Sequence, residues 1–139
     1  LHVERDPFFV AQSLLAARRE FYGDETRWYS FKPPRVEELL ALPAEDQVAG
    51  QVLAIQTALH DSLDPIGSAH VHVSYEAFCA HPERLWARLC DAMCAEGFDS
   101  MPEYRGPSAF VCHNSVHIPG ERERNLRAAL HRAKRWANP

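Results

Sequence analysis

The chain has 139 residues, of which 46% are apolar, so it can bury one hydrophobic core of modest size. Its formal net charge of −4 argues against nucleic acid as a partner, because binding to many phosphates requires a basic surface. No stretch approaches the roughly 18 apolar residues of a membrane span. No basic and apolar signal segment opens the chain either, so we expect a cytoplasmic protein.

The cysteines and histidines are too sparse to predict a metal site. The four cysteines form no C-x-x-C pair and no dense pattern of the secreted kind, so we expect reduced, mostly buried thiols. His70 and His72 share one face of a predicted strand, but no third ligand follows at a suitable spacing. We therefore predict two half-exposed histidines and no bound metal.

The first predicted element is a short strand over residues 1–4, which turns at once into a helix. Asp6 has the side chain of an N-cap, and Pro7 suits the first helical position, where its missing N–H costs no hydrogen bond. Gly23 ends the helical pattern as a C-cap. Apolar residues recur along one face of this helix at Val10, Leu14, Ala17 and Phe21. We expect this face to lie on the core.

Two polar residues flank the start of this helix. Arg5 ends the strand, and Ser13 lies at the edge of the apolar stripe. Because helical side chains lean toward the N-terminus, the Ser13 hydroxyl should point toward the positive end of the helix dipole and toward Arg5. A guanidinium, a hydroxyl and a helix N-terminus together favour a site for a phosphate group. The residues alone leave open a second interpretation, in which Arg5 pairs with a neighbouring side chain and Ser13 has no ligand.

The stretch from Gly23 to Pro34 is irregular and rich in aromatic residues. Trp28 and Tyr29 would suit the wall of an acceptor pocket, because aromatic rings with a polar tip bind sugars and other ring-bearing molecules well. The other interpretation is that both side chains only cover the core. Both interpretations remain open at this point.

Two helices are predicted next, over residues 35–42 and residues 45–63. The longer one has an apolar face formed by Val48, Val52, Ile55 and Leu59. Gln47 and Gln51 lie at the margin of that face, where they could reach into a cleft, although a glutamine at a helix edge is usually solvated. We therefore expect a packed helix, with both interpretations of the two glutamines open.

A second strand and two more helices follow. Alternating side chains predict a strand over residues 69–75, and an apolar stripe predicts a helix over about residues 82–97. Residues 99–119 contain several prolines and little periodicity, so we expect them to cross the surface without regular structure. The last helix is predicted to run from Pro119 to Ala137.

Two motifs in this pattern resemble the sulfotransferases that use 3′-phosphoadenosine 5′-phosphosulfate. The first is Val-Glu-Arg-Asp-Pro at residues 3–7 with a serine at position 13, which is similar to the element that binds the nucleotide's 3′-phosphate in that family. The second is the pair Tyr75-Glu76 at a strand end, followed by a proline and a helix. The resemblance covers residues 1–97, and the aromatic stretch is most similar to bacterial enzymes of the carbohydrate or small-molecule type.

The resemblance and the alternation of strands with helices predict the same fold class. We expect an α/β domain of three layers with a parallel sheet and flanking helices, the nucleoside-kinase-like arrangement of the sulfotransferases. In the family, the loop that holds the 5′-phosphosulfate lies upstream of the Arg-Asp-Pro corner, as the acceptor base commonly does. We therefore expect residues 1–139 to be the C-terminal part of a single sulfotransferase domain, incomplete at its N-terminus.

The resemblance implies transfer of a sulfuryl group from 3′-phosphoadenosine 5′-phosphosulfate to a hydroxyl or amine of a small-molecule or carbohydrate acceptor. It assigns the 3′-phosphate to Arg5 and Ser13, and it places Tyr75 near the nucleotide. The residues alone leave open a second interpretation, in which Tyr75 is an ordinary core residue. The family's late basic loop has no Arg-Lys-Gly match here, so Arg122 and Arg124 are the candidates for that contact. No catalytic residue is predicted in this chain.

Two other functions remain open from the sequence. A nucleotide or phosphate kinase of related fold would also use arginine and helix N-termini, and in a non-catalytic binding domain Arg5 and Ser13 would be incidental. A Lys- or Arg-Ser-Gly-Thr loop upstream would favour sulfate transfer, whereas G-x-x-x-x-G-K-[ST] would favour a kinase. A homo-oligomer is compatible with each of these functions.

We predict that these 139 residues alone do not transfer sulfate, because the expected phosphosulfate loop and its strand are missing from them. The measurement is expression with and without the natural upstream sequence, followed by assays of sulfate transfer and thermal unfolding. A short chain that unfolds cooperatively and transfers sulfate would contradict the prediction.

Overall fold

The computed structural model describes residues 1–136, apart from the side chains of residues 68, 69, 135 and 136. The described chain forms two compact units. Unit 1 consists of Leu1–Arg5 and Leu63–Asn114, and unit 2 consists of Asp6–Ser62 and the residues from Ser115 onward. The prediction of a single sulfotransferase domain stays a prediction.

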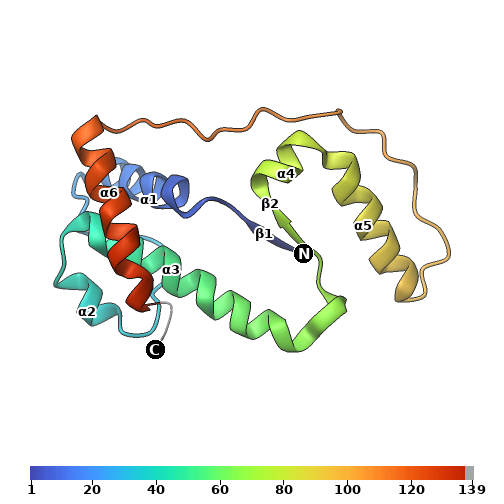
Figure 1. Cartoon of the computed structure of the whole chain (residues 1–139), viewed down its shortest axis with the longest axis horizontal. Coiled ribbons are helices and arrows are strands. Elements are labelled where there is room, and N and C mark those ends of the chain that lie inside the picture. The colour runs from blue at the N-terminus through green and yellow to red at the C-terminus, as the bar shows by residue number, and fades with distance from the viewer. Residues whose placement is uncertain (137–139) are drawn as a thin grey trace. The chain divides into compact units, whose positions relative to one another are not determined.

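The described residues are mostly helical, as Figure 1 shows. In chain order the elements are β1 (His2–Glu4), α1 (Pro7–Tyr22), α2 (Val36–Leu40), α3 (Ala44–Leu63), the 3-10 helix η1 (Asp64–Ala69), β2 (His72–Ser74), α4 (Tyr75–Ala80), α5 (Pro82–Ala95), α6 (Gly120–Arg132) and the 3-10 helix η2 (Ala133–Trp136). The described helices include none that is both long and apolar enough to cross a membrane.

The predicted three-layer α/β fold is wrong. The two expected strands are present, and they pair in parallel with Val3 opposite Val73, but they form a sheet of two strands only. A layered parallel sheet needs interior strands that helices cover on both faces. Within residues 1–136 each strand has a single neighbour, and Val3 is 49% exposed. The sheet therefore joins two distant chain segments by local pairing and does not form a central layer.

The core of unit 2 lies between α1, α3 and α6. Phe8, Ala11 and Leu15 of α1 pack with Val48 and Val52 of α3, and Leu126 of α6 completes this cluster. The buried face of α1 is thus not the one predicted from the sequence, because Phe21 is 62% exposed whereas Phe8 is 2% exposed. Asp6 caps α1 as expected and accepts a hydrogen bond of 2.8 Å from the Phe8 N–H.

A smaller core holds unit 1 together. Val71 and Val73 from the second strand region pack with Leu85 of α5, and Phe78, Leu89 and Ala92 lie against them. The sequence predicted that Tyr75 ends the strand, but in the structure Tyr75 begins α4. The Ser74 hydroxyl accepts a hydrogen bond from the Ala77 N–H, so serine stops the strand and starts the helix in one step.

Two other predicted segments agree with the structure in outline. Residues 99–119 contain no helix or strand, as expected for a segment rich in proline. The last helix is shorter than predicted, since α6 ends at Arg132 and one turn of 3-10 helix follows it. The predicted end at Ala137 lies outside the described residues.

We predict that Leu126→Ala lowers the free energy of unfolding of unit 2 by about 2–5 kcal/mol, because Leu126 is fully buried and truncation leaves a cavity. Urea denaturation followed by circular dichroism measures the change. Leu59→Ala removes the same atoms from a side chain that is 42% exposed and serves as the matched control. Equal losses in the two variants would show that the cluster of α1, α3 and α6 is not the core.

Candidate functional site

The parallel pairing of β1 with β2 brings two predicted site residues of unit 1 together. Glu4 lies opposite Ser74 in the register, so the next residues, Arg5 and Tyr75, leave the sheet at the same edge. The Arg5 guanidinium carbon lies 4.9 Å from the centroid of the Tyr75 ring, a distance typical of a cation–π contact. The carboxyl edge of parallel strands is where ligands commonly bind in proteins with such strands.

A third segment of the chain reaches Arg5 and fixes its guanidinium. The Nε of Arg5 donates a hydrogen bond of 2.9 Å to the side-chain oxygen of Asn114, and its NH2 group donates one of 2.6 Å to the carbonyl of His113. Two bonds from the Nε–NH2 edge of a planar guanidinium determine its orientation as well as its position. Arg5 is therefore held half-buried at the strand end rather than extended into solvent.

The same segment also contacts the start of α4. The Asn114 amide donates a hydrogen bond of 2.6 Å to Glu76, and the His113 N–H donates one of 3.2 Å to the Tyr75 hydroxyl. We call these five residues, Arg5, Tyr75, Glu76, His113 and Asn114, the strand-end cluster. Sequence reasoning named Arg5 and Tyr75 but missed Asn114 and His113, because an irregular segment has no periodicity that predicts where its side chains point.

Ser13 belongs to unit 2, where it is exposed on α1. Its hydroxyl donates a hydrogen bond of 2.8 Å to the carbonyl of Phe9, one turn toward the start of the helix. The hydroxyl thus points toward the start of α1, as the sequence predicted. To donate to a phosphate, it would have to release the Phe9 carbonyl, and such bonds to the preceding turn are weak enough to exchange. Its phosphate-binding role stays a prediction.

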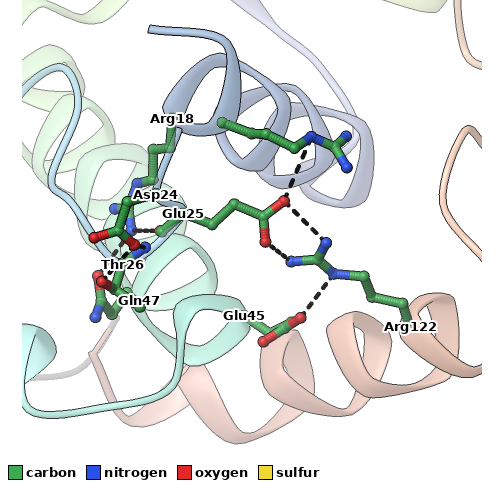
Figure 2. Close-up of polar contacts among 8 residues, drawn as sticks. Arg18, Asp24, Glu25, Thr26, Glu45, Gln47 and Arg122 are labelled. Atoms are coloured by element: carbon green, nitrogen blue, oxygen red, sulfur yellow. Dashed lines mark hydrogen bonds and ion pairs between the residues drawn. The ribbon is translucent and has the colours of Figure 1, made fainter. Parts of the chain in front are cut away.

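Arg122, the second predicted site residue in unit 2, lies in a network of carboxylates (Figure 2). Its Nε donates a hydrogen bond of 2.8 Å to Glu45, and its NH1 and NH2 groups both donate to the carboxylate of Glu25. These contacts raise the pKa of Arg122, mainly through Glu25, and lower that of Glu25, mainly through Arg122. A nucleotide phosphate that binds Arg122 would have to replace the carboxylates of Glu25 and Glu45. The other candidate, Arg124, is exposed on α6.

A second polar group in unit 2 surrounds a buried arginine. Arg18 is fully buried, and its guanidinium donates to the side-chain oxygens of Gln47 at 2.7 Å and Gln51 at 3.0 Å. Burial lowers the pKa of Arg18. Both glutamines are buried rather than solvated, because they supply the oxygens that replace water around this cation.

One of the buried glutamines, Gln51, also fixes the aromatic stretch that sequence reasoning singled out. The Gln51 amide donates hydrogen bonds of 2.9 and 2.8 Å to the carbonyls of Tyr29 and Phe31. The Trp28 ring covers the Arg18 guanidinium, with 4.9 Å between its centroid and the guanidinium carbon. Trp28 therefore contributes to packing around a buried cation, which corresponds to the interpretation of this ring as a cover for the interior.

An apolar pocket of about 280 Å³ lies in unit 1 beside α5. Its walls include the rings of Phe78, Trp86, Tyr104 and Phe110. The polar tips of two of these rings bind the backbone, since the Trp86 Nε1–H donates to Pro102 and the Tyr104 hydroxyl donates to Pro107. The pocket therefore offers apolar walls without polar groups that would orient a ligand.

Cysteine and histidine do not form a metal site within the described residues. No group of three or more histidine, cysteine or acidic side chains in this part of the chain is arranged to hold an ion. All four cysteines are free thiols, and only Cys79 is buried, so the prediction of mostly buried thiols is wrong. His72 is half-exposed as expected and lies 2.9 Å from the carboxylate of Glu4.

Comparisons of this chain with models of protein families, with curated proteins and with solved structures found no match. The functional proposals below therefore depend on the residues of the two units and on the motifs in the sequence.

We predict that Glu25→Gln destabilises unit 2 by about 1–3 kcal/mol at neutral pH, because it removes charge-assisted bonds from a pair whose side chains are only 20% and 24% exposed. The pKa of Glu25 is lowered in the folded state, so its contribution is present above the ordinary glutamate pKa and is lost as the pH falls through the folded value. The difference between wild type and Glu25→Gln should accordingly shrink in acid, as urea denaturation over a pH series would measure.

Glu38→Gln is the matched control for this prediction. Glu38 pairs with Arg35 at 2.7 Å, but both side chains are about half exposed, and solvent screens such pairs. We expect a much smaller change in stability that depends little on pH. A Glu25→Gln variant whose stability follows that of Glu38→Gln at every pH would show that the pair with Arg122 does not stabilise the unit.

Proposed function

We propose that the chain carries the 3′-phosphate-binding corner of a sulfotransferase, which moves a sulfuryl group from 3′-phosphoadenosine 5′-phosphosulfate to an acceptor hydroxyl or amine. The proposal does not depend on the three-layer fold. It depends on the two motifs and on one observation, which is that Arg5 and Tyr75, named by separate motifs about seventy residues apart, meet at one edge of the paired strands.

The chemistry of these side chains fits a nucleotide that carries an additional phosphate. A guanidinium binds a phosphate through parallel N–H bonds that match the spacing of its oxygens. An aromatic ring offers a face for a purine base and contacts the same guanidinium. A phosphate bound here would receive N–H bonds from Arg5 in exchange for some of that residue's present contacts. Ser13 is included as a second phosphate ligand on the basis of the resemblance alone.

The proposed reaction is a group transfer in which the bond between sulfur and the bridging oxygen of the donor breaks. A bond forms between sulfur and the acceptor oxygen or nitrogen, the acceptor loses a proton, and 3′-phosphoadenosine 5′-phosphate leaves. Positioning and electrostatic stabilisation account for most of the catalysis in such transfers. In this proposal Arg5 binds and orients the end of the nucleotide that does not react, and we assign neither the acceptor base nor the cation at the bridging oxygen to a residue of this chain.

We predict that Arg5→Ala weakens the binding of 3′-phosphoadenosine 5′-phosphate by about ten- to a hundredfold, because a hydrogen-bonded contact with a charged group contributes about 1.5–3 kcal/mol. Adenosine 5′-phosphate, which lacks the 3′-phosphate, should bind the variant and the wild type with similar affinity. Isothermal titration calorimetry with both nucleotides measures these affinities.

Arg105→Ala is the matched control, since Arg105 is an exposed arginine in the same unit. It should leave both affinities unchanged. A wild-type protein that binds the two nucleotides equally well would exclude recognition of the 3′-phosphate and favour a kinase or a non-catalytic binding domain. Unchanged affinity in Arg5→Ala would remove Arg5 from the site.

A further inference from the structure

Asn114 lies between a cation and a carboxylate in the strand-end cluster. Its side-chain oxygen accepts the bond of 2.9 Å from the Arg5 Nε, and its amide nitrogen donates the bond of 2.6 Å to Glu76. The two partners determine which way the amide faces, because Arg5 can only donate and an ionised Glu76 can only accept. Asn114 lies outside the residues covered by the sulfotransferase resemblance.

An amide is suited to this place in a way that an acidic side chain is not. It holds the guanidinium by a hydrogen bond but carries no charge, so this contact does not cancel the charge of Arg5. A carboxylate at the same position would form an ion pair with Arg5 and would also lie directly beside Glu76, where two negative charges repel each other. The neutral side chain therefore orients the cation without neutralising its charge.

The backbone next to Asn114 strengthens this arrangement. The carbonyl of His113 accepts the bond of 2.6 Å from the NH2 group of Arg5, and the N–H of His113 donates to the hydroxyl of Tyr75. Arg5 is thus held along its Nε–NH2 edge by residues 113 and 114 and on one face by the Tyr75 ring. The orientation of its guanidinium depends on a short segment that is itself attached to α4 through Tyr75 and Glu76.

We propose that Asn114 is a positioning residue that acts through Arg5 and sets the selectivity of the site for nucleotides that carry a 3′-phosphate. This inference rests on the proposed function and goes beyond it, because it assigns selectivity to a segment that contains neither motif. Glu76 is the second positioning residue, since it holds the Asn114 amide in the orientation that presents its oxygen to Arg5.

The test measures a ratio of affinities rather than one affinity. Calorimetry gives the dissociation constants of adenosine 5′-phosphate and of 3′-phosphoadenosine 5′-phosphate. The first constant divided by the second is the selectivity ratio, which reports the contact with the 3′-phosphate. We expect Asn114→Ala to lower this ratio by about tenfold, because the hydrogen bond to a charged group is lost. Asn114→Asp should lower it further, because its carboxylate competes with the phosphate for Arg5. The affinity for adenosine 5′-phosphate should stay within about twofold of wild type.

A double-variant experiment separates positioning from a general structural role. If Asn114 acts through Arg5, then adding Asn114→Ala to Arg5→Ala should not lower the ratio further, whereas independent effects would add. Asn125→Ala, which removes an exposed asparagine of α6, is the control and should leave the ratio unchanged.

Three results would overturn the inference. An unchanged ratio in both Asn114 variants would show that Asn114 has no effect on selectivity. If the Asn114 variants bind both nucleotides more weakly by the same factor and have a lower melting temperature than wild type, Asn114 only supports the fold. A wild-type protein without preference for the 3′-phosphate would remove the proposed function itself, and this result is recognised before any Asn114 variant is compared.

Discussion

The register between β1 and β2 is the constraint on which the arrangement of unit 1 depends. Three paired residues are enough to align the two strand ends, because Glu4 opposite Ser74 determines that Arg5 and Tyr75 follow at the same edge. A shift of one residue would turn every side chain of a strand to the opposite face of the sheet. Val73 would then leave the cluster that it forms with Val71 and Leu85, so burial of these side chains stabilises the register.

Unit 2 depends on a different interaction, the burial of a charged group among neutral ones. Arg18 carries a positive charge in the interior, and Gln47 supports it with a side-chain oxygen while its amide donates to the carbonyl of Leu42. Gln51 has the same double role toward Tyr29 and Phe31. Replacing one member of such a group leaves the others buried without partners, which costs more than the bond itself. The irregular stretch after α1 is therefore ordered by polar contacts rather than by an apolar core.

The sequence predicted local structure well where a few residues suffice to determine it. Asp6 with Pro7 located the start of α1, and the glycine at position 23 located its end, where it adopts the left-handed conformation that favours glycine. The predicted three layers failed because the number of strands depends on distant pairing, which short alternating patterns do not determine. The face of α1 was misjudged because Arg18 lies on the buried side, and a charged residue there breaks the apolar pattern that predicts burial.

The candidate site was predictable in part for the same reason. Arg5 and Tyr75 stand next to strand ends and belong to short motifs, whereas Asn114 has no neighbour in the sequence that indicates a role. Asn114 and Arg5 are more than a hundred residues apart in the sequence, yet their side chains share a hydrogen bond. Contacts of this kind are a property of the folded chain and not of a sequence window.

The segment that ends in Asn114 has no regular secondary structure, and this affects how unit 1 responds to fluctuation. Among its attachments are the bonds from Trp86 to Pro102, from the Phe110 N–H to the Cys79 carbonyl, and from His113 to Tyr75. Segments that are held mainly at separate points open at a lower free energy than the elements against which they pack. Detachment of residues 110–114 would break the two bonds that Arg5 donates to His113 and Asn114 while the paired strands stay closed. The order of the strand-end cluster is therefore governed by local opening of this segment, and hydrogen exchange of its amides would be faster than that of β2.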